Sequence, residues 1–226
     1  MLVGRSIVND RIDKADCITD ETVLEVDGLS CEGYFNDVSF SVRRGEVLAF
    51  TGLFGDGRGE LAECLFGARQ ATGGEIRLHG ETLDTRSILR VIKSGVSMVP
   101  RNRKERSILK DLSVKDNLSM AYFTSAHRGL MIRRGEEARR FEEKRRETNI
   151  RVGNPDDPIT SLSGGNQQKV VLAKWLQRNC EVIIFDEPTR GIDIGSKVQV
   201  YELLDRLARE GRAIVVASGH LPELMG

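Results

Sequence analysis

The order of apolar and polar residues divides the chain into short strands and longer helices. Alternation of the two residue types predicts strands with one buried face at residues 23–26, 38–42 and 75–78. Unbroken apolar runs predict further strands at residues 47–50, 96–99, 182–185 and 213–217. The run at 47–50 is typical of a strand buried on both faces. Helices are predicted at residues 60–66, 87–94, 164–177 and 197–209. Strands that alternate with helices favour an α/β fold with a mainly parallel, doubly covered sheet.

Two flanking regions depart from this alternation. A β-rich lobe comes first, and a helical insertion subdomain is expected at about residues 112–160, within a domain of residues 21–226. Residues 1–20 are polar and aperiodic, as in a linker or arm, and the chain is expected to be cut shortly after the loop of its last strand. Acids and bases three and four apart at 133–146 favour a solvated helix over a basic partner surface.

Composition narrows the class of protein. Of 226 residues, 39% are hydrophobic and 30% charged, which is typical of a soluble globular chain. The 34 basic residues balance 34 acidic ones, so charge gives no reason to expect a nucleic-acid partner. Neither a signal peptide nor an apolar run of about 18 residues is found, which predicts a cytoplasmic location. The four scattered cysteines are expected to be reduced thiols, with no metal site.

A glycine-rich loop follows the strand at 47–50 and precedes a helix. Glycines let a backbone turn tightly with its N–H groups facing phosphate oxygens. Gly52 and Gly57 have the spacing of the phosphate-loop pattern G-x-x-x-x-G-K-[ST], but Arg58 replaces the lysine and Gly59 replaces the serine or threonine. An arginine fork aims differently from a lysine, and Gly59 has no hydroxyl for magnesium, so hydrolysis should suffer. An ordinary strand-to-helix turn is the alternative. The expected nucleotide-binding residues are Gly52, Leu53, Phe54, Gly55, Asp56, Gly57, Arg58, Gly59 and Glu60.

Two carboxylates end the apolar strand at 182–185. Ligands of open α/β sheets bind at the carboxyl ends of the strands. Asp186 is therefore expected to hold Mg²⁺, and Glu187 to polarise an attacking water as the catalytic carboxylate. The alternative is a strand end that merely caps the turn at Pro188.

A serine and two glycines open the helix predicted at 164–177. Ser163, Gly164 and Gly165 would expose backbone N–H groups, which is an anion-binding arrangement. Helix capping alone explains Ser163. It does not explain two glycines, because each costs about 1 kcal/mol in a helix.

Residues 162–169 resemble the signature motif of ABC transporter ATPases, with Asn166 where glutamine is commoner. Asp186 and Glu187 then match that family's Walker B carboxylates, and residues 191–193 match its D-loop. The resemblance implies a P-loop NTPase fold of the ABC ATPase type, with ATP and Mg²⁺ as cofactors. The signature residues implied are Leu162, Ser163, Gly164, Gly165 and Asn166, and the D-loop residue is Asp193.

Three phrases resemble one subgroup, the importers of monosaccharides such as ribose, galactose and xylose. They lie at residues 36–40, 186–193 and 221–223. In that subgroup two ABC domains stand in tandem, and residues 1–5 resemble the joint between them, which implies the C-terminal half. The implied partners are the N-terminal ABC domain or a second ABC subunit, the transmembrane permease subunits and, indirectly, an external sugar-binding protein. The implied location is the cytoplasmic face of the cell membrane.

The departures from the family pattern gather on the phosphate-loop side. Arg101 stands nearest the place of a glutamine, and Gly219 aligns with a histidine that contacts the γ-phosphate. His220 lies one residue late; a bulge would make it catalytic, and otherwise it is a surface histidine. Tyr34 or Phe35 is expected either to stack on adenine or to pack in the core.

Two ABC domains sandwich each ATP between the phosphate loop of one and the signature of the other. The resemblance therefore implies that this chain's signature completes the partner's site, while the Arg58 site binds ATP weakly or without turnover. Two alternatives remain, an autonomous ATPase homodimer and a non-catalytic regulatory half. An insertion of this length is too short for the coiled coils of DNA-repair or chromosome ABC ATPases.

Overall fold

In the computed structural model, the described residues are 17–53, 55–125, 134–178 and 180–219. They form two four-stranded sheets, one antiparallel with order β2-β1-β4-β5 and one parallel with order β3-β8-β7-β6. The predicted α/β class and mainly parallel sheet are confirmed, and the β-rich opening forms the separate antiparallel sheet. The antiparallel strands are β1 (Thr22–Cys31), β2 (Phe35–Arg43), β4 (Gly73–Leu78) and β5 (Glu81–Thr82). The parallel strands are β3 (Val47–Phe50), β6 (Val96–Val99), β7 (Val182–Asp186) and β8 (Ala213–Ala217).

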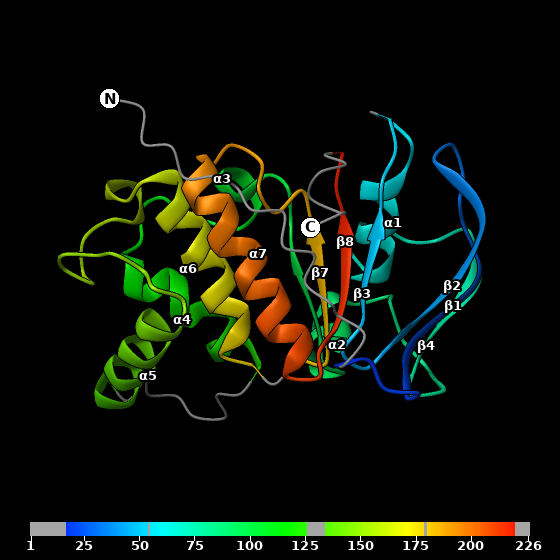
Figure 1. Cartoon of the computed structure of the whole chain (residues 1–226), viewed down its shortest axis with the longest axis horizontal. Coiled ribbons are helices and arrows are strands. Elements are labelled where there is room, and N and C mark those ends of the chain that lie inside the picture. The colour runs from blue at the N-terminus through cyan, green and yellow to red at the C-terminus, as the bar shows by residue number, and fades with distance from the viewer. Residues whose placement is uncertain (1–16, 54, 126–133, 179, 220–226) are drawn as a thin grey trace.

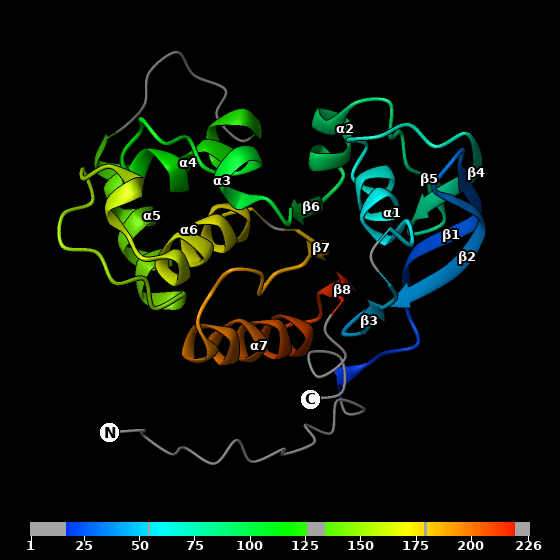
Figure 2. The same cartoon turned by 90° about the horizontal axis from the view of Figure 1, so that it is seen from above.

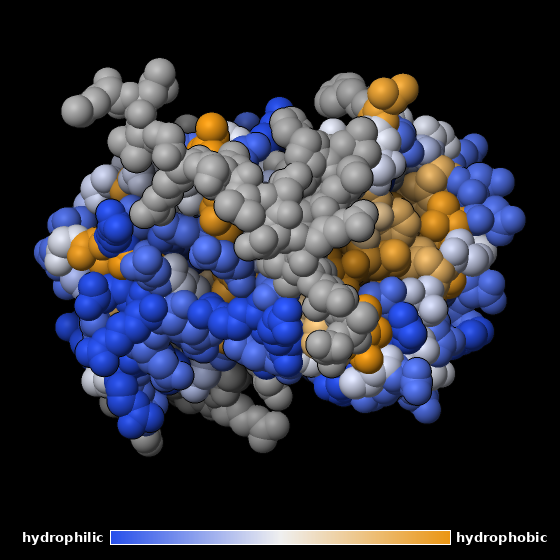
Figure 3. Space-filling view, viewed as in Figure 1, coloured by the Kyte–Doolittle hydropathy of each residue, from blue (hydrophilic) through white to orange (hydrophobic). Residues whose placement is uncertain are grey.

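Helices cover both faces of the parallel sheet. Figure 2 shows α1, α2 and the antiparallel sheet on one side, with α6 and α7 on the other. Their bounds are α1 (Arg58–Leu65), α2 (Ile88–Lys93), α6 (Gly164–Leu176) and α7 (Ile194–Arg209). The insertion contributes α4 (Val114–Ser125) and α5 (Arg134–Glu147), after the short α3 (Arg103–Arg106). Figure 3 shows a hydrophilic surface over α5, in agreement with the predicted solvated helix.

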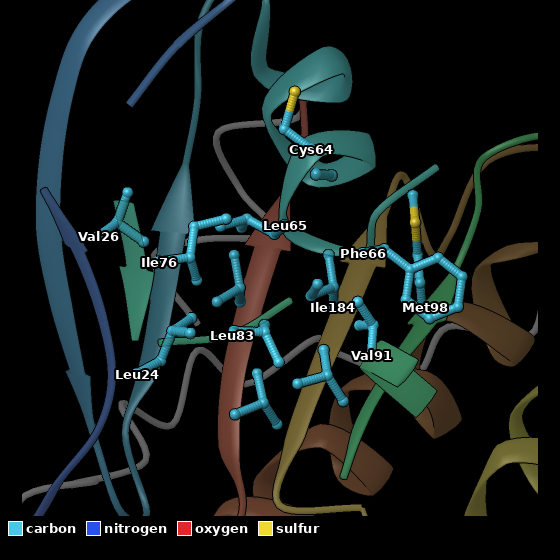
Figure 4. Packing of buried hydrophobic residues seen from close by; sticks show 14 of the residues in the cluster. Leu24, Val26, Cys64, Leu65, Phe66, Ile76, Leu83, Val91, Met98 and Ile184 are labelled. Atoms are coloured by element: carbon cyan, nitrogen blue, oxygen red, sulfur yellow. The ribbon is translucent and has the colours of Figure 1, made fainter. Parts of the chain in front are cut away.

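Alternation along the central strands separates two hydrophobic cores. In β7, Ile184 belongs to the core shared with α1 and the antiparallel sheet, whereas Phe185 belongs to the core under α6 and α7. Figure 4 shows Leu65 of α1, Ile76 of β4 and Ile184 packed in the first of these cores. Because successive side chains of a strand point to opposite faces, an unbroken apolar run is what such a doubly covered strand requires.

The prediction that the strand at 47–50 is buried on both faces does not hold. All four residues of β3 are only half-buried, so the expectation of a strand buried on both faces is wrong. β3 is the edge strand of the parallel sheet and has a neighbour, β8, on one side only. Its apolar run therefore reflects partial cover from each layer, not a central position.

Helix N-termini and strand C-termini lie together at one edge of the molecule. Figure 1 shows the N-terminal ends of α6 and α7 and the C-terminal ends of β7 and β8 at the upper edge of the molecule. This is the edge at which open α/β sheets bind ligands. Within the described residues, no helix is long and apolar enough to cross a membrane.

Candidate functional site

Two glycines of the loop between β3 and α1 have a left-handed backbone. Gly55 and Gly57 have φ angles of 86° and 87°, which only glycine adopts without strain. A Cβ at Gly57 would also lie 2.6 Å from the carbonyl oxygen of Tyr34. The sequence therefore needs glycine here for conformation and for space. Phe54, expected in the nucleotide site, lies outside the described residues.

Arg58 folds back into the loop that it ends. Its Nη1 donates to the carbonyl oxygens of Gly52 at 3.1 Å and Leu53 at 3.0 Å, and to Asp56 Oδ2 at 2.8 Å. Its Nη2 donates to Glu187 Oε1 at 2.9 Å. Burial would lower the pKa of Arg58, but the Glu187 and Asp56 carboxylates outweigh it and raise the pKa. The guanidinium thus stays charged and cross-links the loop to the end of the sheet.

Glu187, the expected catalytic carboxylate, is held by this contact. The same oxygen, Oε1, also accepts from the backbone N–H of Gly219 at 2.9 Å. Glu187 lies in the left-handed region with φ 51°, directly after the last residue of β7. A Cβ at Gly219 would lie 2.8 Å from Arg58 Nη2, so the arginine fills space that a larger residue there would need. His220 lies outside the described residues, and its assignment as a catalytic residue stays a prediction.

Asp186, the expected metal ligand, pairs with Arg101. Arg101 Nε donates to Asp186 Oδ2 at 2.8 Å, and the carboxylate side chain is only 4% exposed. Burial raises the pKa of Asp186, and the Arg101 contacts partly oppose that shift. The sequence pattern identified Arg101 as a departure but missed its partner, because the two residues lie 85 positions apart.

These residues do not fit a magnesium ion. Mg²⁺ prefers six oxygen ligands in octahedral geometry. Gly59 offers no hydroxyl, and a guanidinium carries no oxygen. Asp186 Oδ1 is buried without a hydrogen-bond partner among the described residues, so one carboxylate oxygen remains for a ligand. No group of three His, Cys, Asp or Glu side chains that would hold a metal converges anywhere in the described part of the chain.

The signature residues form the start of α6, where Ser163 is exposed and Gly165 is buried. Ser163 is the N-cap, and its Oγ accepts from the backbone N–H of Asn166 at 3.4 Å and from Asn166 Nδ2 at 3.2 Å. Asn166 Oδ1 accepts in turn from the backbone N–H of Arg151 at 3.0 Å. Leu162 is half-buried, and its carbonyl oxygen accepts from Gln167 Nε2 at 3.0 Å. These bonds fix the helix end while Ser163 itself stays exposed.

One of the two glycines in this turn has a packing role. A Cβ at Gly165 would lie 2.2 Å from Ser196 Oγ in the first turn of α7. Asp193, the expected D-loop residue, is the N-cap of α7: its carboxylate accepts from the Ser196 backbone N–H at 3.0 Å and from the Ser196 hydroxyl at 2.7 Å. The Ser196 hydroxyl and backbone bonds lower the pKa of Asp193. Close contact of α6 and α7 therefore accounts for Gly165, which capping alone did not explain.

The two aromatic candidates for adenine differ in position. Phe35 packs against the core, whereas Tyr34 is 47% exposed. Tyr34 lines an open hollow of about 570 Å³, and the Arg69 guanidinium lies 4.6 Å from its ring centre. The Tyr34 carbonyl already touches the phosphate loop at Gly57. Phe35 lines the same hollow, so stacking of Tyr34 or Phe35 on adenine stays a prediction.

The two halves of the site lie apart in this chain. Figures 1 and 2 both place the N-terminal end of α6 on the far side of the parallel sheet from α1 and the phosphate loop. A phosphate group bound by the loop would therefore not reach the signature residues of the same chain.

Comparison with known proteins agrees with this geometry. The ABC transporter family profile matches residues 35–190. The chain is 40% identical over 226 residues to the ribose import ATP-binding protein RbsA of Geobacillus kaustophilus, covering 100% of this chain and 46% of that protein. It is 45% identical over 205 residues to the ribose import ATP-binding protein RbsA 2 of Rubrobacter xylanophilus, covering 91% of this chain and 40% of that protein. The chain thus spans less than half the length of these relatives.

Solved structures share the fold. A bacterial ABC transporter cassette in dimeric form superimposes with TM-score 0.76 at 20% identity, over 88% of this chain and 89% of that one. The CbiO1 protein of Clostridium perfringens, part of an ABC transporter complex, superimposes with TM-score 0.71 at 22% identity, over 89% of this chain and 79% of that one. The predicted ABC ATPase fold is confirmed by these likenesses.

Proposed function

This chain belongs to the ABC transporter family, and we propose that it is the second of two ATP-binding domains in a monosaccharide importer. It would stand beside an N-terminal ABC domain of the same polypeptide or a second ABC subunit. Its place would be the cytoplasmic face of the membrane, against transmembrane permease subunits that receive sugar from an external binding protein. The names of the relatives, ribose import ATP-binding proteins, support the sugar class.

One observation supports different roles for the phosphate-loop side and the signature side of the chain. The phosphate-loop side is closed by two arginine–carboxylate pairs, whereas the signature side is open and has its exposed cap residue at a helix N-terminus. A helix N-terminus favours negative charge and presents unpaired N–H groups. Ser163, Gly164 and Gly165 would therefore bind the γ-phosphate of ATP held by the partner domain.

The chain's own loop would bind nucleotide with little or no turnover. A carboxylate that polarises water needs a free oxygen facing the nucleotide. Glu187 instead offers Oε1 to Arg58 and to the Gly219 N–H. In this arrangement Glu187 would hold the arginine in place, and Oε1 would not be free to act as a general base.

ATP hydrolysis by the purified chain alone tests this proposal. We expect turnover at least about 100-fold below that of a competent ABC domain assayed in parallel, because Glu187 Oε1 and Asp186 Oδ2 are each bonded to an arginine. Turnover comparable with the competent domain would contradict the proposal and favour an autonomous homodimer. Nucleotide binding without hydrolysis even beside the partner domain would instead favour a non-catalytic regulatory half.

A further inference from the structure

Two departures from the phosphate-loop pattern form a single structural feature. A Cβ at Gly59 would lie 1.2 Å from Arg101 Nη2, so the guanidinium occupies the space of the side chain that Gly59 lacks. Gly59 is buried in the first turn of α1, while Arg101 follows β6. The small residue at one position and the large cation at the other are therefore complementary. An arginine in this conformation at position 101 requires a residue without a side chain at position 59.

The arginine in this position reaches the one buried carboxylate of the site. Its Nε donates to Asp186 Oδ2 at 2.8 Å, and its backbone also bonds this carboxylate. The second oxygen, Asp186 Oδ1, is buried and has no hydrogen-bond partner within the described residues. A buried carboxylate oxygen without a partner indicates room beside Arg101 for a water or another hydrogen-bond donor.

We propose that the guanidinium of Arg101 takes the place of the divalent cation, so that this loop binds nucleotide phosphate without a metal ion. This inference rests on the proposed function as an ATP-binding domain and adds how the loop holds its anion. Asp186, the acid expected to hold a metal, has an arginine as its counterion, at a place where Gly59 supplies no hydroxyl. A second cation at the same place would meet the fixed positive charge of Arg101.

The remaining donors suit a phosphate group. Among the described residues, Nε is the only side-chain nitrogen of Arg101 with a hydrogen-bond partner, so Nη1 and Nη2 remain available. Nη2 lies against the first turn of α1, where helix N–H groups point outward. A planar guanidinium offers parallel donors that match phosphate oxygens, which an ammonium group does not. The fork and the helix end together form an anion site on one side of the loop.

Equilibrium binding of a fluorescent ATP analogue, N-methylanthraniloyl-ATP, to the full 226-residue chain tests the proposal. The titration is made once in excess EDTA and once in excess Mg²⁺. We expect dissociation constants within about twofold of each other, since no metal ligand set is present. Affinity at least about tenfold tighter in Mg²⁺ would overturn the proposal, and so would no binding under either condition.

A paired variant sharpens the same experiment. Arg101→Gln together with Gly59→Ser removes the internal cation and supplies two oxygen ligands beside Asp186. Binding should become metal-dependent, at least about tenfold tighter in Mg²⁺ than in EDTA. Arg106→Gln, with an arginine that is 57% exposed and paired with Glu63, is the matched control and should behave as the unaltered chain. A paired variant that folds, as judged by circular dichroism, and still binds equally with and without Mg²⁺ would contradict the role of Arg101.

Failure here is distinguishable from failure of the proposed function. Metal dependence of the unaltered loop would leave the role of the signature in the partner's site intact. Conversely, a tandem protein that tolerates Ser163→Arg would contradict that role without changing the metal dependence of this loop.

Discussion

The phosphate loop and the signature turn are both helix N-termini, yet they differ in how their polar groups are used. At the loop, Arg58 and Arg101 bond the nearby carboxylates and loop carbonyls, so most of the charges are paired within the chain. At the signature turn, Ser163 and Asn166 bond each other without a charged partner, and Ser163 stays exposed. The two helix ends therefore differ in how far the chain itself pairs the charged groups around them. The difference teaches that the match of a motif to a sequence pattern says less about ligand binding than whether the donors of the motif are already hydrogen-bonded within the chain.

The largest change in ATPase activity is expected from Ser163→Arg in the full tandem protein, which tests the signature side of the comparison. A long cation would cover the exposed cap and displace the partner's γ-phosphate. Steady-state ATPase activity should fall by about 100-fold or more, as on loss of a key anion-binding donor. Activity and transport that survive the change would show that the signature side is not used.

The next prediction concerns the pH dependence of stability that a buried lysine of the signature helix α6 contributes. Lys174 on α6 donates to the Ser107 carbonyl oxygen at 2.6 Å, and burial lowers its pKa from 10.5 to about 8. Below about pH 8 both folded and unfolded states hold the proton, and between about 8 and 10.5 only the unfolded state does. The contribution of Lys174 to the free energy of unfolding, measured as the difference between the unaltered chain and Lys174→Met, should therefore rise with pH across that window by up to about 3 kcal/mol.

Chemical denaturation at a series of pH values checks this expectation. Lys174→Met should remove the rise, while Lys110→Met, at an exposed position, should retain it. If Lys174→Met and the unaltered chain had the same pH dependence of the free energy of unfolding, Lys174 would not be the group responsible for the rise.

Packing under the signature turn gives the next effect. Gly165→Ala would place its Cβ 2.2 Å from Ser196 Oγ, and the contact with α7 must shift. Overpacking of this kind costs about 1–3 kcal/mol in free energy of unfolding, measured by urea titration. Gly135→Ala is the matched control in a helix, because its Cβ would meet nothing within 4 Å. It should stabilise the chain by up to about 1 kcal/mol. Equal free energies of unfolding for Gly165→Ala and Gly135→Ala would contradict the packing role of Gly165.

The smallest effect is expected on the phosphate-loop side. Arg58→Lys restores the residue type of the phosphate-loop pattern but leaves Gly59 and Arg101 in place. ATPase activity of the tandem protein should change by less than about twofold, because this loop is not expected to contribute turnover. A change of about tenfold in either direction would show that the two sides of the chain share the chemistry.

Much of the fold followed from the hydrophobic pattern. The strands at 47–50, 96–99 and 213–217 were predicted with the bounds that β3, β6 and β8 have, because each is a short apolar run between turns. The start of α7 was placed three residues late, at 197 and not at Ile194, because Asp193 caps the helix through its side chain. Edge position also escaped prediction, since a half-buried and a fully buried strand share the same apolar composition.

The sequence by itself determined where the candidate site residues stand along the chain: the loop glycines, the carboxylates Asp186 and Glu187, and the signature turn at Ser163. It determined this because glycine conformation, strand ends and helix caps are local properties, encoded within a few residues. Only the tertiary structure decided which charges pair. Arg58 meets Glu187 across 129 positions, and Arg101 meets Asp186 across 85. Such partners depend on the order of strands in the sheet, which places the C-terminal ends of β3, β8, β7 and β6 side by side although they lie far apart in the sequence.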